Sequence, residues 1–296
     1  MGETSSSETD LETWFEANGR DLPWRRTRDP WAVLVSEVML QQTQVDRIAG
    51  RWPRFMERFP NPSALAESPV SDVIEHWSGL GYNRRAVNLH RCAQEMVGRF
   101  DGRVPSTVGE LMSLPGIGPY TARAVAVFAF ELAEAVVDTN VARILARFHN
   151  RELGKAEVQR LADEWVDGRE PWRWNQALLD VGALFCRPRT PQCGQCPLAP
   201  DCCWRSVRIG RPNGGGAADP ATRSAGVSGR QSTFEGSDRQ GRGRLVEALR
   251  REPVSTSRLA AVMGWPTDSD RARRVAASLV ADGLAEQTDG HYRLPG

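Results

Sequence analysis

Four cysteines close together in the sequence constrain this chain more than any other feature. Cys186, Cys193, Cys196 and Cys202 lie within seventeen residues, in the spacing C-x6-C-x2-C-x5-C. Four thiolates in such a short segment are the ligand set of a [4Fe-4S] cluster. A zinc site usually shows two C-x2-4-C pairs, and a pair of disulfides is the third interpretation. The spacing favours the cluster and leaves the other two open.

Length and composition are those of an ordinary globular chain. The chain has 296 residues, 40% of them hydrophobic and 25% charged, which suits about two domains. The net charge is +1, but residues 206–296 carry fourteen arginines against ten acidic residues, so the positive charge is concentrated there. No signal peptide and no apolar run of membrane length is present. Of the 38 basic residues only Lys155 is a lysine, which restricts any chemistry that needs a side-chain amine.

The sequence pattern divides the chain into four segments. Residues 1–10 are polar and are predicted to be disordered, whereas residues 11–205 repeat apolar positions at helical spacing and include the cysteine loop at 186–202. Residues 206–233 are rich in Gly, Ser, Ala, Arg and Pro, which predicts a flexible linker. Residues 234–296 form a small C-terminal module.

The C-terminal module resembles a winged helix. Three short helices are predicted at 242–249, 257–263 and 269–281, and Asp289-Gly290 is a strong hairpin signal between two short strands. The third helix carries Arg271, Arg273 and Arg274, which suit contacts with phosphates or base edges. A solvated arginine-rich face on a module for stability or protein contact is the alternative.

A glycine-rich turn joins two helical stretches in the segment Leu114-Pro-Gly-Ile-Gly-Pro-Tyr-Thr-Ala122. Gly116 and Gly118 allow the backbone to approach a phosphate, and the helix that follows directs its N–H groups and positive dipole toward it. This is the helix-hairpin-helix pattern, which binds the DNA backbone irrespective of sequence. Asp138 follows a Val-rich segment and precedes another helix, so it is either an N-cap or a site residue as well.

The hairpin, Asp138 and the cysteine loop, in this order, resemble the helix-hairpin-helix DNA glycosylases with an iron-sulfur cluster. Four further segments are similar to the MutY-type adenine glycosylases of that superfamily: Leu22-Pro-Trp-Arg25, Ser36-Glu-Val-Met-Leu-Gln-Gln-Thr-Gln-Val45, Gly79-Leu-Gly-Tyr82 and Asn175-Gln-Ala177. The resemblance implies an all-α, two-lobed fold. Tyr120 stands where endonuclease III-type relatives have a Schiff-base lysine, which makes a lyase reaction by that route unexpected.

Cleavage of a purine N-glycosidic bond needs an acid to protonate the leaving base and a carboxylate to stabilise the positive sugar. Glu37 lies in an apolar segment, so burial should raise its pKa and keep it protonated. Asp138, at a helix N-terminus, should stay ionised. These two residues are therefore the candidate acid and the candidate stabilising carboxylate.

The resemblance also implies roles for other residues. Tyr120 and Asn140 would assist Asp138; Gln42 and Thr43 would contact the base opposite adenine. The adenine pocket would be lined by Arg20, Trp24, Arg25 and Asp180, the last a shorter replacement for a Glu found in some relatives. Leu80, beside Gly81, would wedge into the duplex and Tyr82 would intercalate, filling the space that a flipped base leaves. Phosphate contacts are predicted for Gly116, Gly118, Arg187 and Arg189.

We therefore expect a monofunctional adenine DNA glycosylase that removes adenine mispaired with 8-oxoguanine or guanine. Its expected partner is duplex DNA that contains such a mispair, and its expected cofactor is a [4Fe-4S] cluster. We expect it to be a monomer in the cytoplasm, associated with the nucleoid. A thymine mismatch glycosylase and a non-catalytic iron-sulfur DNA-binding regulator are the alternatives. Residues 234–296 are too few for the Nudix-like domain that commonly reads 8-oxoguanine in this family, and Asn83 replaces a tyrosine of many relatives.

Overall fold

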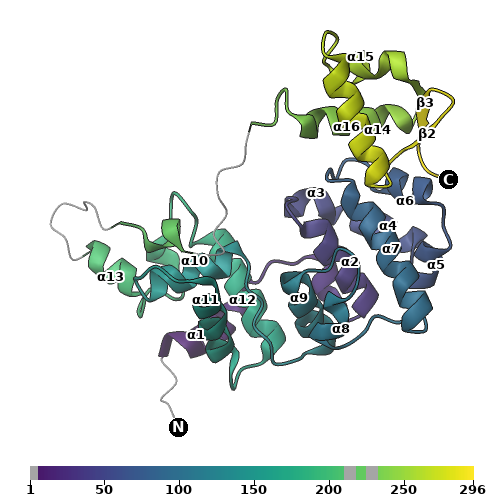
Figure 1. The fold of residues 1–296 in the computed structure, drawn as a ribbon. Helices are drawn as coiled ribbons and strands as arrows, with labels where there is room; N and C mark the ends of the chain where they lie inside the picture. Colours follow the sequence, from purple (N-terminus) through teal and green to yellow (C-terminus); the bar gives the residue numbers. More distant parts are fainter. Residues whose placement is uncertain (1–5, 210–217, 225–232) are drawn as a thin grey trace. The chain divides into compact units, whose positions relative to one another are not determined.

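The computed structural model describes residues 6–209, 218–224 and 233–296 (Figure 1). The fold is mostly helical, which confirms the predicted all-α class. It divides into two compact units, and each unit is assembled from two separate stretches of chain. Met1–Leu22 and Ala122–Arg230 make the first unit, and Pro23–Thr121 and Gln231–Gly296 make the second. In the described residues, no helix combines the length and the apolar character needed to span a bilayer.

The first unit is a set of helices around one apolar core. Helices α1 and α12 pack against each other, and α10 packs on α12 and on η3. The core takes side chains from all four of these elements, including Leu11, Leu145, Trp174 and Ala221. The elements are α1 (Ser6–Asn18), most of α9 (Pro119–Phe130), α10 (Thr139–Phe148), α11 (Lys155–Val166), α12 (Pro171–Leu184), η2 (Cys193–Gln195), α13 (Cys203–Ile209) and η3 (Pro220–Arg223).

The second unit begins with short helices that surround α2. Helix α2 starts where the Asp29 side chain accepts hydrogen bonds from the amides of Trp31 and Ala32, with Pro30 in the first turn. Every residue from Trp31 to Met39 is buried, so α2 is a central helix with no solvated face. The elements are η1 (Pro23–Arg26), α2 (Pro30–Leu40), α3 (Val45–Ala49), α4 (Trp52–Arg58), α5 (Pro62–Ala66), α6 (Val70–His76), α7 (Arg84–Arg99) and α8 (Val108–Met112).

The C-terminal module, residues 233–296, belongs to the second unit and has three helices and a small sheet. Strands β2 and β3 pair across Asp289-Gly290, whose positive φ angles of 50° and 72° are those of a tight hairpin turn. A further strand, β1, pairs with β3 and gives the order β1-β3-β2. The elements are α14 (Asp238–Leu249), β1 (Val254–Ser255), η4 (Thr256–Arg258), α15 (Leu259–Met263), α16 (Ser269–Ala281), β2 (Glu286–Thr288) and β3 (His291–Arg293).

Three boundaries differ from those expected from the sequence. Helix α1 begins at Ser6, inside the segment predicted to be disordered; residues 1–5 lie outside the described residues. Helix α14 begins at Asp238 rather than Arg242, because the Ser237 side chain caps it and two glycines in the helix weakened its pattern.

The third difference lies within the predicted linker, 206–233. Residues 218–224 are ordered: they contain η3, and Ala221 is buried in the core of the first unit. The Leu153 amide donates to Ser224 Oγ at 3.0 Å, and Asp219 pairs with Arg147. A seven-residue stretch with only two apolar side chains gives no periodicity from which this anchoring could be predicted. Residues 206–209 of the predicted linker belong to α13, and 210–217 and 225–232 lie outside the described residues.

Candidate functional site

Glu37 lies in the interior of the second unit. It is the eighth residue of α2, counted from Pro30, and it is 4% exposed among Val35, Val38 and the other buried residues of the helix. Apolar surroundings favour the neutral form of a carboxyl group. Glu37 is thus a buried carboxyl group in a helix of buried residues.

A buried arginine organises the polypeptide at the end of α2. Arg85, on α7, is 8% exposed, and its Nη1 donates to the carbonyls of Val38, Met39 and Gln41 at 2.9, 2.8 and 2.6 Å. The carbonyls of Val38 and Met39 belong to the last turn of α2 and that of Gln41 to its C-cap, where no amide of the same helix reaches them. One guanidinium therefore terminates the helix that carries Glu37.

The same side chain joins two loops that are distant in sequence. Arg85 Nη2 donates to Thr43 Oγ1 at 2.9 Å and to the Gly81 carbonyl at 3.1 Å. It thus ties the Gln42 turn (Gln41–Thr43) to the Leu80 loop (Leu80–Tyr82). Burial lowers the pKa of Arg85 to about 10, and the nearby Tyr82 acts in the opposite direction.

Both loops contain a residue in a costly backbone conformation. Gln42 has φ 57° and Tyr82 has φ 48°, in the left-handed region that non-glycine residues seldom adopt. Gln42 is exposed and Tyr82 is 39% exposed, whereas Leu80, predicted to wedge into the duplex, is 1% exposed. The large side chain that these loops present to solvent is Tyr82.

The glycine-rich turn has the expected hairpin form. It joins α8 to α9, and Gly116 has φ 79°, with a hypothetical Cβ only 2.8 Å from Asn88 Cβ. Only glycine meets both the conformation and the space at this position. No atom lies within 4 Å of the position that a Cβ would take at Gly118, so the backbone there is open to a ligand. Tyr120 is half-buried in the first turn of α9.

Two residues predicted for the adenine pocket lie in η1 of the second unit. Trp24 is 6% exposed and Arg25 is 9% exposed. The Trp24 ring meets Trp52 edge to face, with 6.3 Å between centroids. The structure thus places these two in the interior of the second unit, while Arg20 and Asp180 belong to the first.

Asp138 is the N-cap of α10 in the first unit. Its Oδ1 accepts from the amides of Asn140 and Val141 at 2.7 and 2.8 Å, and its Oδ2 accepts from Asn140 Nδ2 at 2.7 Å. Three donors converge on one carboxylate, so its orientation is fixed. The structure brings the predicted pair Asp138 and Asn140 together directly.

The electrostatic balance at Asp138 differs from the expectation based on the helix terminus alone. Burial raises the pKa of Asp138, whereas the hydrogen bonds from Val141 and Asn140 and the charge of Arg143 lower it; burial is the larger effect. The carboxylate therefore depends on its donors and on Arg143 to remain ionised near neutral pH.

Arg143 connects Asp138 with the cysteine loop (residues 186–202). Its Nη2 donates to Asn140 Oδ1 at 2.6 Å and to the Gly182 carbonyl at 2.9 Å, and its Nε donates to the Cys186 carbonyl at 2.5 Å. Gly182 is required here, because a Cβ at this position would lie 2.4 Å from Asn140 Cβ. A continuous set of hydrogen bonds therefore runs from the Asp138 carboxylate to the backbone of a cysteine.

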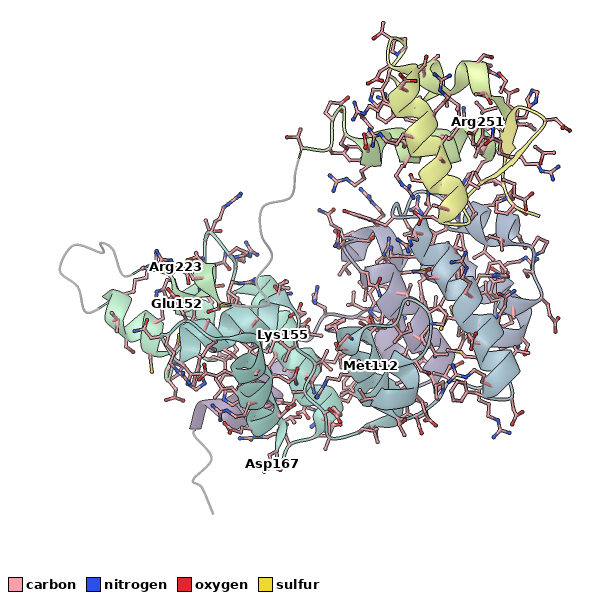
Figure 2. The ribbon with its side chains drawn as sticks, viewed as in Figure 1. Met112, Glu152, Lys155, Asp167, Arg223 and Arg251 are labelled. Carbon is pink, nitrogen blue, oxygen red and sulfur yellow. The ribbon has the colours of Figure 1, made fainter. Side chains whose placement is uncertain are left out.

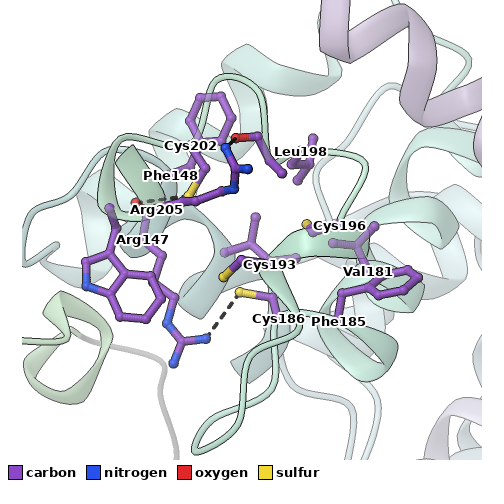
Figure 3. A pocket seen from close by; sticks show the side chains of 13 residues that line it. Arg147, Phe148, Val181, Phe185, Cys186, Cys193, Cys196, Leu198, Cys202 and Arg205 are labelled. Atoms are coloured by element: carbon purple, nitrogen blue, oxygen red, sulfur yellow. Dashed lines mark hydrogen bonds between the residues drawn. The ribbon is translucent and has the colours of Figure 1, made fainter. Parts of the chain in front are cut away.

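The four predicted ligand cysteines line one cavity in the first unit (Figure 3). Apolar side chains complete its wall, among them Phe148, Val181 and Leu198. Burial raises the pKa of the Cys196 thiol to about 12, and the other three cysteines add to this effect. Such thiols are protonated unless a cationic centre binds them as thiolates.

Arg147 supplies positive charge at this cavity. It is 2% exposed, and its Nη1 lies 3.3 Å from Cys186 Sγ, as Figure 3 shows. It also donates to the carbonyls of Arg187 and Pro188 at 2.8 and 3.0 Å and pairs with Asp219 at 2.6 Å. No three His, Cys, Asp or Glu side chains within the described ranges converge closely enough to hold a single metal ion. A four-iron cluster separates its ligands more widely, since each thiolate binds a different iron.

The other predicted residues of the first unit fall into two environments. Asp180 is fully buried, and it accepts from both the amide and Nε of Arg20, at 2.9 and 2.7 Å. Arg187 and Arg189 are both exposed on the cysteine loop. Lys155 is exposed in the first turn of α11 (Figure 2).

Four residues at these sites were not predicted from the sequence: Arg85, Arg143, Arg147 and Gly182. The three arginines stand among apolar residues in helices, a pattern that could have drawn attention to them. Their partners are mostly backbone carbonyls of distant loops, however, and those leave no trace in the sequence.

A search of protein-family models matches residues 35–167 to the HhH-GPD superfamily base excision DNA repair proteins. The adenine DNA glycosylase of Mycobacterium tuberculosis (strain H37Rv) is 41% identical, over 98% of this chain and 94% of its own length. The adenine DNA glycosylase of Homo sapiens is 38% identical, over 68% of this chain and 40% of its own length.

Solved structures have the same fold. A thermostable thymine-DNA glycosylase is 29% identical, with a TM-score of 0.62 over 68% of this chain and 95% of its own. A non-covalent endonuclease III–DNA complex is 23% identical, with a TM-score of 0.61 over 69% of this chain and 95% of its own. The near full-length match to the mycobacterial enzyme includes most of the C-terminal module, so that module is a shared feature. The chain thus belongs to the adenine DNA glycosylase family of the HhH-GPD superfamily.

Proposed function

We propose that this protein is a monofunctional adenine DNA glycosylase that acts on duplex DNA in which adenine is mispaired with 8-oxoguanine or guanine. The observation that carries the proposal is the contrast between its two carboxyl groups. Glu37 is 4% exposed in an apolar helix, and Asp138 is held by three hydrogen-bond donors. These are the environments that an acid and a charge-stabilising carboxylate need.

In the reaction, Glu37 donates its proton to the leaving adenine as the glycosidic bond breaks. Asp138 stabilises the positive charge that develops on the sugar, and Asn140 and Arg143 keep the carboxylate oriented and ionised. Water adds to the sugar and leaves an abasic site. Tyr120 replaces the amine that would form a Schiff base, so the DNA strand stays intact.

Cys186, Cys193, Cys196 and Cys202 would hold a [4Fe-4S] cluster. The donor set fits: four sulfurs line one cavity, and Arg147 approaches one of them. When bound, the cluster fixes the course of the cysteine loop. That loop then presents Arg187 and Arg189 to phosphates of the DNA backbone.

Duplexes with one adenine opposite 8-oxoguanine test this function, compared with duplexes carrying adenine opposite guanine or thymine opposite guanine. We expect strand scission only after alkali treatment, and only at adenine. Glu37→Gln should abolish it, while the variant still binds the duplex. Scission without alkali would contradict the monofunctional reaction, and scission at thymine would favour the thymine mismatch glycosylase instead.

A further inference from the structure

A groove of about 890 Å³ runs between the C-terminal module and the Leu80 loop of the second unit. One wall contains the Gln42 turn, Arg47 and Tyr82. The other wall contains Phe234 and Arg239, which lie at the start of the module and on α14. Nothing in the family resemblance assigns a role to these two residues.

The two walls are packed together by a shared core. Ile74 of α6 and Val87 of α7 belong to the same apolar cluster as Leu245 and the other core residues of the module. Arg250 Nη2 donates to the Ile74 carbonyl at 3.0 Å, and Arg84 lies 3.4 Å from Asp282. The groove is therefore formed by packed elements of a single unit.

The lining of the groove is strongly basic. It contains five arginines and one acidic residue, and its other polar members are four amides and the Tyr82 hydroxyl; the arginines are Arg47, Arg84, Arg85, Arg239 and Arg242. Asp282 is paired with Arg242 and Arg84. An excess of positive charge in a groove suits a phosphodiester backbone.

Two exposed aromatic side chains lie close to Arg239. Phe234 is 52% exposed and Tyr82 is 39% exposed. The Arg239 guanidinium lies 5.2 Å from the Phe234 ring centroid, and its Nη1 lies 3.4 Å from the Tyr82 hydroxyl. Aromatic rings combined with arginine in a basic groove are the arrangement that stacks nucleobases of an unpaired or distorted strand.

The helix that the sequence predicted to contact DNA is less suited to it. Arg271 of α16 lies 4.0 Å from the Trp265 ring centroid and pairs with Asp238. Arg273 pairs with Asp270 and Arg274 pairs with Asp238, so each arginine of this helix has a carboxylate partner inside the module.

We infer that the groove binds the DNA strand opposite the adenine, with Arg239 on a phosphate and Phe234 stacked on a base of that strand. The choice of strand rests on the proposed function and on the expectation that Gln42, at the edge of the groove, contacts the base opposite the adenine. The C-terminal module thereby contributes to DNA binding through α14 and the segment before it, and not through α16.

The test uses the full chain in a Glu37→Gln background, so that the duplex is not consumed. Affinity for an adenine:8-oxoguanine duplex is measured by fluorescence anisotropy at several salt concentrations, for the double variant Phe234→Ala/Arg239→Gln. The matched control is Arg273→Gln, which removes an exposed arginine of α16 that does not line the groove. Thermal unfolding checks that each variant is folded, and Arg239→Glu serves as a second groove variant.

We expect the double variant to bind about tenfold more weakly or worse, because it lacks one stacking contact and one phosphate contact. Its logarithmic salt slope should fall by about 0.9. Hydroxyl-radical footprinting should show lost protection on the strand opposite the adenine, and Arg273→Gln should match the background protein.

Unchanged affinity and footprint in both groove variants would overturn the inference and leave the groove to a protein partner. Protection lost only on the adenine strand would also overturn it. These outcomes are independent of the proposed function, which fails instead if the chain with Glu37 intact releases no adenine.

Discussion

Arg85 in the second unit and Arg147 in the first unit both bind the backbone of a loop, but their other partners differ. Each is a nearly buried arginine in a helix that donates to the carbonyls of a loop. Burial acts to lower the pKa of Arg147, but its carboxylate partner Asp219 and the Cys186 sulfur together outweigh burial and raise that pKa. Arg85 has carbonyls and one hydroxyl as its hydrogen-bond acceptors within the described residues, and burial lowers its pKa to about 10.

The difference reflects what each loop carries. The cysteine loop would hold a cluster through thiolates, so Arg147 faces negative charge from the Cys186 sulfur as well as from Asp219. The Gln42 turn and the Leu80 loop carry no acidic side chain. A guanidinium with five donors satisfies many carbonyls at once in such a place, which a lysine cannot do. The same residue type thus acts as a counter-ion in one unit and as a helix-end cap in the other.

Removal of Arg147 should have the largest effect. Arg147→Met leaves Asp219 and two loop carbonyls without their donor, and we expect a loss of about 3–5 kcal/mol in the free energy of unfolding. Denaturant unfolding measures this, and iron and sulfide analysis should show a reduced cluster content. Arg151→Met is the control, because its pair with Glu157 is at the surface and should contribute about 0.5 kcal/mol. Equal effects of the two substitutions would refute the role of Arg147.

Removal of Arg85 should have a smaller effect on stability and a clear effect on activity. Arg85→Met leaves backbone carbonyls unsatisfied, at a cost of about 2–3 kcal/mol. The Gln42 turn and Leu80 loop should lose their fixed geometry, so the single-turnover rate of adenine release should fall. Arg99→Met, on an exposed part of the same helix, provides the comparison. If both variants behave alike, Arg85 does not organise the loops.

Arg143 connects the cysteine loop with the chemistry, so its removal should shift a pH profile. Its charge lowers the pKa of Asp138, against the raising effect of burial. In the proposed reaction Asp138 acts as a carboxylate, so activity should decline as the pH falls through its pKa. Arg143→Gln should raise that pKa and move the acidic limb of the single-turnover rate to higher pH. A uniform decrease in rate with no shift of the limb would indicate a purely structural role.

The smallest of these effects is expected for the substitution of Asp219. Burial alone would raise its pKa, but the hydrogen bond and charge of Arg147 outweigh this and lower it. A carboxyl group with a lowered folded-state pKa stabilises the protein above its unfolded-state pKa of about 3.9, and this contribution is lost as the pH falls through the folded-state value. The melting temperatures of wild type and Asp219→Asn should therefore differ at neutral pH and converge in acid. If the difference in melting temperature were the same at all pH values, the stabilising role of the Arg147–Asp219 ion pair would be contradicted.

The sequence predicted most of the local structure. Asp138 as an N-cap, the Gly116 turn and the Asp289-Gly290 hairpin follow from rules that act over a few residues. The arginines that fix the loops could not be predicted in this way, because Arg85 contacts carbonyls up to 47 residues away and Arg147 a carboxylate 72 residues away. Asp219 lies in a segment without periodicity, so its anchoring to the first unit was likewise hidden.

The central claim is that Glu37 and Asp138 release adenine from a mispair. Its most direct test is to identify the free base by mass spectrometry after a single turnover on a duplex with adenine opposite 8-oxoguanine. The account predicts one equivalent of free adenine for the wild-type protein and none for Glu37→Gln, which should still bind the duplex. Release of adenine by Glu37→Gln at the wild-type rate, or release of no base by the wild type, would contradict it.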